Sequence, residues 1–223
     1  MCLIVVAHRV SDRFPLVIAA NRDEEYARPT RAAHFWDDHP DVLGGRDLRA
    51  GGTWLAITRN GRVAAVTNLR GEAKPGARSR GVLVGDFVTS NVDPMTYAQS
   101  VQKEDFAGFH LIVGVIGGAF VHLADELRVW SDGIHGVSNG PVSERSEKID
   151  VAVEHMREAL VTEDAEELAR DLMAFFARPP AFVASELYGT RSTTAIVASR
   201  ERILFVEQSY GEVARLRSYA VAR

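Results

Sequence analysis

The residue best suited to covalent chemistry in this sequence is Cys2, the only cysteine among 223 residues. If Met1 is removed, the thiol of Cys2 and a free α-amino group stand on one residue. These groups titrate at roughly 8.5 and 7.7–8.0, so a proton passes readily between them at neutral pH. N-terminal nucleophiles use this pairing of nucleophile and base. A lone cysteine in an apolar strand is also commonly a small core residue, so position alone leaves both roles open.

Charged residues that would support such a thiol follow the second apolar run of the sequence. Residues 2–7 and 16–20 are predicted strands, and the polar segment with Pro15 between them predicts an antiparallel hairpin. Opposed residues then sum to about 23 or 24, which places Cys2 across from Asn21 or Arg22. Arg22 would favour the thiolate, and Asp23 would hold the ammonium or the guanidinium.

A second predicted hairpin leads to Asn68. The dipeptide Asn60-Gly61 between residues 53–58 and 62–68 predicts a type I′ turn, in which both central residues have positive φ. Opposed residues then sum to 121, and Thr53 faces Asn68. The Asn68 amide would either cap the strand end or donate to a developing oxyanion.

Other motifs in the sequence give weaker evidence of a catalytic, metal or nucleotide site. Gly136–Gly140 matches the G-x-S-x-G nucleophile elbow, but the histidine that must follow Ser138 is present only as His155, inside a predicted helix. Ser138 is therefore not expected to be a nucleophile. His34 and His39 lack a carboxylate at ligand spacing and are interpreted as loop residues. With no Walker loop and no G-x-G-x-x-G motif, the sequence indicates no metal and no cofactor.

The sequence leaves the role of two sets of basic residues open. The first is a Gly- and Pro-containing loop that is either solvated or a guide for an anionic substrate; its basic residues are Arg70, Lys74, Arg78 and Arg80, opposed only by Glu72. The second is Arg191, which begins a predicted strand. Arg191 is either a surface arginine or a second cation at the same sheet end as Cys2.

The elements expected to position these residues alternate between strands and helices. Residues 26–50 are predicted to form a long loop. Further strands are expected at 111–116, 119–123, 127–130, 190–197 and 203–207. Helices are expected at 81–90 and 94–103, the latter capped by Asp93, then from Ser143 and from a cap near Thr162. Two groups of amphipathic helices predict an α+β fold with two antiparallel sheets between two helical layers, a four-layer αββα sandwich.

Composition limits the classes of partner. Hydrophobic residues make up 46% and charged residues 25%, with a net charge of −4. These values are ordinary for a globular protein and predict a single domain over residues 1–223 that binds no nucleic acid. A single cysteine suits a reducing cytosol, and no segment has the length of a transmembrane helix or the features of a secretory signal. The expected location is cytoplasmic, and the oligomeric state is left open.

Taken together, six motifs resemble the NRDE family, also called the Transport and Golgi Organisation protein 2 family. They are Met1-Cys2, Ala20–Glu24, Gly51–Leu55, Thr67–Arg70, Ser138–Pro141 and Tyr188–Arg191. The family is similar in layout to N-terminal-nucleophile hydrolases of the choloylglycine hydrolase and penicillin V acylase type. One departure is local: the family often continues from Asn-Gly-Pro into Trp-Pro-Lys, whereas here Pro141 is followed by Val142-Ser143-Glu144.

The resemblance implies a role for each matched residue. It implies Cys2 as the nucleophile, Arg22 and Asp23 as its support, and Arg191 as a second arginine. Asn68 and Asn139 would lie near the oxyanion. The residues implied to bind substrate are Asn21, Glu24, Trp54 and Arg70.

Two functions are expected from this reasoning. The first is hydrolysis or acyl transfer at an amide or thioester bond of a small, anionic acyl substrate, through an acyl-Cys2 intermediate. The alternative is a non-catalytic carrier of haem, acyl-CoA or lipid on the same fold. Both functions predict that Cys2, Arg22, Asp23, Asn68, Asn139 and Arg191 converge in a pocket walled partly by residues 26–50.

Overall fold

The chain forms two compact units, each with one antiparallel sheet and helices. The computed structural model describes residues 2–71, 74–144, 146–211 and 215–222. Unit 1 comprises Met1–Ala27, Asp132–Ser138 and Ser143–Arg223, and unit 2 comprises Arg28–Ser131 and Asn139–Val142. The predicted α+β class with two antiparallel sheets is confirmed.

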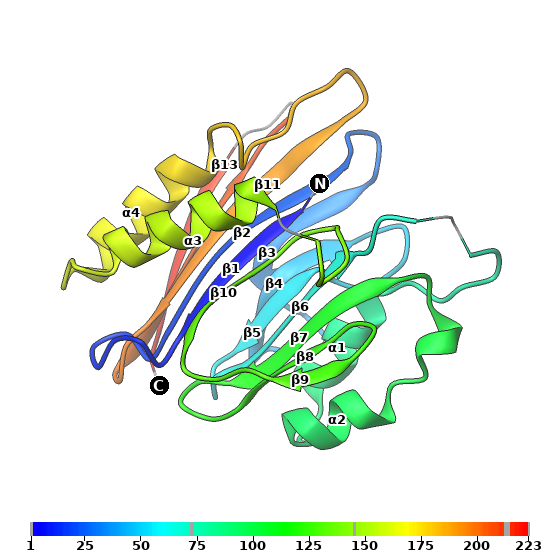
Figure 1. Ribbon diagram of the computed structural model, residues 1–223, viewed down its shortest axis with the longest axis horizontal. Helices are drawn as coiled ribbons and strands as arrows, with labels where there is room; N and C mark the ends of the chain where they lie inside the picture. The colour runs from blue at the N-terminus through cyan, green and yellow to red at the C-terminus, as the bar shows by residue number, and fades with distance from the viewer. Residues whose placement is uncertain (1, 72–73, 145, 212–214, 223) are drawn as a thin grey trace. The chain divides into compact units, whose positions relative to one another are not determined.

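Unit 1 is built on a sheet of order β10-β1-β2-β11-β12-β13. Helices α3 (Glu147–Ala159) and α4 (Ala165–Phe176) lie along one face of this sheet (Figure 1). Alternate strand residues such as Val5 and Ala19 face the helices and pack with Leu168 and Phe176, because side chains in a strand alternate between its two faces. The strands are β1 (Leu3–His8), β2 (Leu16–Glu25), β10 (Gly133–Val137), β11 (Tyr188–Ala198), β12 (Arg202–Ser209) and β13 (Arg215–Ala222).

The register of unit 1 brings three chain segments to one sheet end. Leu3 pairs with Asn21, so opposed residues of β1 and β2 sum to 24, as predicted. Asn21 in turn pairs with Thr193 of β11. A bulge between Thr190 and Ser192 follows at the same end. The start of β1, the last third of β2 and the start of β11 are therefore neighbours.

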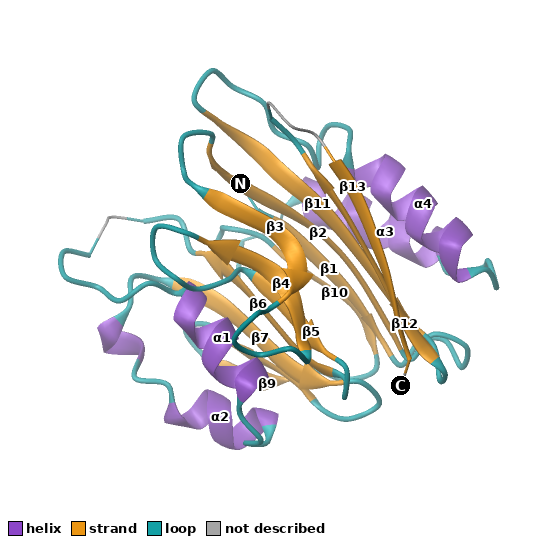
Figure 2. Cartoon of the chain, turned by 180° about the vertical axis from the view of Figure 1, so that it is seen from behind, coloured by secondary structure: helices purple, strands orange, loops and turns teal. Residues whose placement is uncertain are grey.

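Unit 2 is built on a sheet of order β3-β4-β5-β6-β7-β8-β9. Helices α1 (Gly81–Thr89) and α2 (Pro94–Ser100) belong to this unit (Figure 2). Leu83 and Phe87 of α1 are buried in one core with Ala64 and Val113 of the sheet. The strands are β3 (Thr30–Phe35), β4 (Val42–Asp47), β5 (Leu55–Thr58), β6 (Arg62–Asn68), β7 (Phe109–Val115), β8 (Phe120–Leu123) and β9 (Leu127–Val129).

The prediction of a long loop at residues 26–50 is wrong, because this segment contains β3 and β4. Its glycines are strand residues at a close approach. A Cβ on Gly44 would lie 2.6 Å from the carbonyl oxygen of Leu55, and the Trp36 indole donates to the Gly44 carbonyl at 3.0 Å. Glycine is required here by packing and not by a turn.

The predicted register of the second hairpin is wrong by one residue. Leu55 pairs with Ala65, so opposed residues sum to 120 and not 121. The loop has three residues, Arg59-Asn60-Gly61, and among the described residues of that loop only Gly61 has positive φ, at 83°. A three-residue loop that ends in a left-handed glycine is the next most common hairpin connection after the two-residue turns. Thr53 consequently does not face Asn68, whose partner in the sheet is Phe109.

Helix ends differ by a few residues from those predicted. Asp93 caps α2 as expected, accepting from the Met95 and Thr96 amides at 3.1 and 3.0 Å. Helix α2 ends at Ser100, and a short 3-10 turn follows at Lys103–Asp105. Helix α3 begins after Ser146 and not at Ser143, while α4 is capped by Asp164 and not by Thr162. Strands β10 and β13 were not predicted.

No helix in the described part of the chain has the length and apolar character needed to cross a membrane.

Candidate active site

The thiol of Cys2 lies against the backbone of Asp23. The Asp23 N–H donates to Sγ at 3.4 Å, and the thiol donates to the Asp23 carbonyl at 3.6 Å. Cys2 itself is half-buried. Burial and then the negative charge of Asp23 raise the pKa of the Cys2 thiol, while the Asp23 N–H and the Arg22 guanidinium act in the opposite direction. The thiol is therefore held in place and kept protonated while Met1 is attached.

The carboxylate of Asp23 is positioned by β11. Thr190 Oγ1 donates to Asp23 Oδ1 at 2.7 Å, and Thr190 Oγ1 accepts from the Val183 amide at 3.0 Å. Tyr188 Oη donates to the Asp23 carbonyl at 3.1 Å. Burial, and then the negative charge of neighbours such as Asp23, raises the pKa of Tyr188, so the phenol remains a donor. Both backbone and carboxylate of Asp23 are thus fixed from the neighbouring strand.

Arg22 is a buried cation next to this group. Its side chain is 5% exposed and pairs with Glu24 at 3.7 Å. In the sheet Arg22 lies opposite Ser192. Because a buried guanidinium cannot lose its proton, Arg22 supplies a permanent positive charge close to Cys2.

The serine of the G-x-S-x-G motif forms a hydrogen bond with the backbone of Cys2. Ser138 Oγ donates to the Cys2 carbonyl at 2.9 Å, and Ser138 directly follows β10, which pairs with β1. The hydroxyl proton of Ser138 is engaged with a carbonyl in this contact, and the expectation that Ser138 is not a nucleophile stays a prediction. It also fixes the first residues of β1 from the side opposite to β2.

Two predicted site residues, Asn21 and Arg191, have anchoring contacts with backbone carbonyls. The Asn21 amide donates to the carbonyls of Phe176 and Ala181 at 2.8 and 2.9 Å and accepts from Thr193 Oγ1 at 2.7 Å. Asn21 therefore ties β2 to the end of α4. Arg191 lies at the same sheet end as Cys2, and its Nη1 donates to the carbonyls of Glu25 and Tyr26 at 2.8 Å each.

In unit 2 the structure brings together Asn68, Arg70 and Asn139. Asn139 Nδ2 donates to the Asn68 carbonyl at 2.5 Å, and the Arg70 amide donates to the Asn139 carbonyl at 2.6 Å. Asn139 is 8% exposed, and its Oδ1 is buried with no hydrogen-bond partner among the described residues. The side chain of Asn139 is thus held through its nitrogen while its oxygen keeps unused acceptor capacity.

Trp54, which was predicted to bind substrate, and the basic loop both have contacts within unit 2. The indole of Trp54 lies over Gly45, where a Cβ would be 2.1 Å from the ring. Cations of the basic loop contact the segment around residues 104–108: Arg78 pairs with Asp105 at 3.7 Å, Arg80 donates to the Gly108 carbonyl at 3.1 Å, and Lys74 donates to the Glu104 carbonyl. Glu72 lies outside the described residues. The contacts favour a structural role for this loop.

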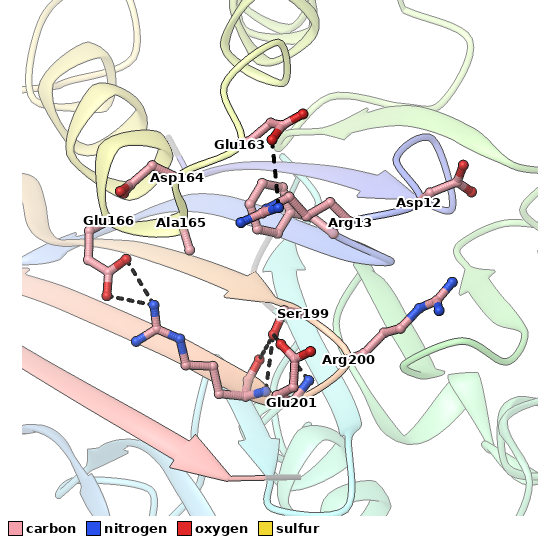
Figure 3. Close-up of a pocket in the computed structure, with 11 residues that line it drawn as sticks. Asp12, Arg13, Glu163, Asp164, Ala165, Glu166, Ser199, Arg200 and Glu201 are labelled. Atoms are coloured by element: carbon pink, nitrogen blue, oxygen red, sulfur yellow. Dashed lines mark hydrogen bonds and ion pairs between the residues drawn. The ribbon is translucent and has the colours of Figure 1, made fainter.

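A cavity of about 510 Å³ in unit 1 lies away from Cys2. Side chains from the β1–β2 turn, the start of α4 and the β11–β12 turn line it, among them Arg13, Glu163 and Arg200 (Figure 3). Cys2 precedes β1, whereas this cavity lies beyond the last residue of β1, so about 20 Å of strand separates them. Two ion pairs line it: Arg13 with Glu163 at 3.7 Å, and Arg202, bidentate to Glu166 at 2.7 and 2.9 Å.

Sequence reasoning missed three residues of the Cys2 group: Tyr188, Thr190 and Ser138. Each lies in a motif that carried the family resemblance. Their roles depend on strand pairing between segments more than 130 residues apart, which no local pattern displays. The sequence signal that these three residues share is their place in motifs of the family resemblance.

Comparison with known proteins finds a matching family model and similar sequences. A family model described as Transport and Golgi organisation 2 matches residues 1–212. The mouse homologue of Transport and Golgi organization 2 is 34% identical over 174 residues, which is 72% of this chain and 62% of the mouse protein. The cattle homologue is 36% identical over 174 residues with the same coverage. The chain thus spans less than two thirds of the length of these relatives.

Solved structures show the fold at low sequence identity. An N-acylethanolamine-hydrolyzing acid amidase orthologue from Caenorhabditis elegans has a TM-score of 0.53 at 10% identity, covering 88% of this chain and 92% of that chain. A mutant of conjugated bile acid hydrolase from Clostridium perfringens has a TM-score of 0.52 at 8% identity, covering 98% and 92%. At these identities the likeness concerns the fold alone.

Proposed function

The chain belongs to the Transport and Golgi organisation 2 family and has the fold of N-terminal-nucleophile hydrolases, and on this basis we propose that it cleaves or transfers an acyl group through Cys2 after removal of Met1. The bond attacked is an amide or a thioester. The observation that carries the proposal is the placement of Cys2 Sγ on the Asp23 backbone, beside the buried cation Arg22. Two solved structures with this fold are an N-acylethanolamine-hydrolyzing acid amidase orthologue and a conjugated bile acid hydrolase.

The proposed reaction has two balanced steps. The α-amino group of Cys2 takes the thiol proton, and the thiolate attacks the carbonyl carbon, forming a C–S bond and an oxyanion. Collapse of this intermediate breaks the C–N or C–S bond of the substrate, and the leaving amine or thiol takes the proton from the ammonium. Water then attacks the acyl-Cys2 thioester, which releases a carboxylic acid and restores the thiol. An acyl acceptor in place of water gives transfer.

Each nearby group has a proposed task. Arg22 stabilises the thiolate, and Asp23 orients the new ammonium. Removal of Met1 also places a positive charge on Cys2 itself, which lowers the pKa of the thiol that burial raises.

The first experiment is intact-mass spectrometry of protein purified from cells, followed by labelling with a β-lactone, a carbonyl electrophile that acylates cysteine. Because Cys2 is the only cysteine, any thiol adduct reports on it alone. We expect a mass without Met1 and a single adduct, which Cys2→Ala abolishes. Cys2→Ser is the matched control, since it keeps a nucleophile of similar size and should be acylated much more slowly.

Quantitative retention of Met1 contradicts the proposal, as does acylation that survives in Cys2→Ala. A protein that is not acylated but binds haem or a long-chain acyl-CoA saturably would instead support the carrier function.

A further inference from the structure

Strand β13 lies at an edge of the unit 1 sheet, outside the area that the two helices of this unit cover. Six strands spaced about 4.8 Å apart form a sheet about 24 Å wide, whereas two helices of about 10 Å each cover about 20 Å. The core under α3 and α4 contains residues of β1, β2, β11 and β12 but none of the described residues of β13. A groove therefore remains between α4 and β13.

The groove has a volume of about 290 Å³ and mostly apolar walls. Met173 of α4 and Leu204 and Val206 of β12 line its inner side, and Leu216 of β13 lines its outer side. Leu204 is 4% exposed, whereas Leu216 is 66% exposed, so the apolar surface runs from the core out to solvent. The volume is at the lower end of the range for ligand pockets, about 300–1,000 Å³. Its size and lining suit a short apolar chain.

Arg170 of α4 adds an uncompensated positive charge to this groove. Glu166, one turn earlier on α4, also lines it, but Arg202 Nη2 donates to both carboxylate oxygens of Glu166 at 2.7 and 2.9 Å. Arg170 forms no hydrogen bond or ion pair with any residue in the described part of the chain. Ser218, which lies opposite Val206 in the sheet, brings a hydroxyl donor to the same groove. The groove thus combines an apolar surface with one free cation and one hydroxyl.

We propose that this groove is a binding site for a short aliphatic carboxylate. The chain lies against Met173, Leu204 and Leu216, where its burial removes apolar surface from water. The carboxylate binds Arg170, because a guanidinium matches a carboxylate in both charge and planar geometry. An aliphatic amine would meet Arg170 with a like charge. The groove shares no residue with the Cys2 group, so binding here does not depend on the proposed reaction.

Met173 allows the test to be made by NMR on protein labelled with ¹³C at the methionine methyl groups, because this residue lines the groove. We expect octanoate to shift the Met173 signal saturably, while the signal of Met95 in unit 2 does not move. Hexanoate should bind more weakly, by about fourfold for each methylene that it lacks.

Substitution of the arginine tests the role of charge. Arg170→Gln should weaken octanoate binding about threefold or more and leave octan-1-ol binding unchanged within about twofold. Arg178→Gln, at an exposed arginine just beyond α4, is the matched control and should change neither. Ser218→Phe, at an exposed strand position, places a ring in the groove and should abolish the octanoate shift of Met173 without changing the circular dichroism spectrum.

Three results would overturn the proposal. The first is a Met173 signal that octanoate does not move or moves without saturation, and the second is equal octanoate binding by the wild type and Arg170→Gln. The third is a Met173 signal that changes with protein concentration and not with octanoate, which would show that a second copy of the chain covers the groove. Cys2→Ala should bind octanoate as the wild type does, so a failure of the proposed reaction leaves this test intact.

Discussion

Cys2 lies between opposite charges, and the balance between them sets its reactivity. Asp23 raises the pKa of the thiol through its charge, while its backbone N–H and Arg22 lower it. The carboxylate of Asp23 is fixed by Thr190, so its effect on the thiol does not depend on side-chain mobility.

Two neutralising substitutions should therefore change thiol reactivity in opposite directions. Asp23→Asn removes the negative charge while its Oδ1 can still accept from Thr190, so the pKa of Cys2 falls and alkylation by iodoacetamide at about pH 7.5 becomes faster. Arg22→Gln removes the positive charge, so the pKa rises and alkylation becomes slower. The measurement is the alkylation rate against pH, with Met1 processing of each variant checked by mass. Shifts of the same sign in both variants would contradict this account.

At the scale of elements, close packing of backbone explains a strand that contains two consecutive glycines. Strand β4 passes so near to β5 that Gly44 has no room for a side chain. The same strand receives the indole N–H of Trp36 on the Gly44 carbonyl.

Gly44→Ala should destabilise the protein by about 1–3 kcal/mol, because the added methyl meets the backbone of Leu55 and Ala56, which cannot move aside without breaking strand pairing. Gly71→Ala is the matched control: a Cβ there meets nothing within 4 Å, so the change should stay within about 0.5 kcal/mol. Urea unfolding followed by circular dichroism gives both free energies. Equal effects of the two substitutions would argue against the close approach.

At the scale of the whole molecule, the chain passes repeatedly between its two units. Unit 1 takes its sequence from three separate segments, and β10 enters its sheet between two segments of unit 2. Neither unit is a continuous piece of chain. This connectivity underlies our proposal that residues 1–223 behave as a single domain.

We therefore expect both units to unfold in one transition. Trp36, Trp54 and Trp130 are the only tryptophans, and all three belong to unit 2, while Cys2 belongs to unit 1. Urea curves from tryptophan fluorescence and from the thiol reactivity of Cys2 thus report on different units, and they should coincide. Two separated midpoints would show independent domains.

Stability should also decrease as the pH falls below about 6.5 because of two buried histidines. Burial lowers the pKa of His8 and, in the other unit, of His110. The unfolded chain takes up protons below about pH 6.5, whereas the folded protein does not, so stability is full above that pH and declines as the pH falls toward the folded pKa values. Carboxylates with a lowered pKa, such as Asp47, matter only below about pH 4. Urea unfolding at several pH values should show a smaller decline for His110→Gln and an unchanged one for His39→Gln.

Local sequence determined the Cys2 end of the protein. Two uninterrupted apolar runs and a short polar turn defined β1, β2 and their register, because a hairpin of adjacent strands depends only on the residues within it. The Asp93 cap was equally local. The proximity of Cys2 to Arg22 and Asp23 could be inferred at this level, since all three belong to one hairpin.

Only the tertiary structure decided what joins this hairpin from a distance. The pairing of β10 with β1 brings Ser138 to the Cys2 carbonyl, and the pairing of β11 with β2 brings Thr190 to Asp23. The glycines of β4 are typical of a loop in the sequence, and only the neighbouring strand shows why they are needed. The amide of Asn21 contacts the end of a helix that begins over 140 residues later. Such contacts depend on which strands become neighbours, and that is settled by packing of the whole sheet rather than by any segment's own pattern.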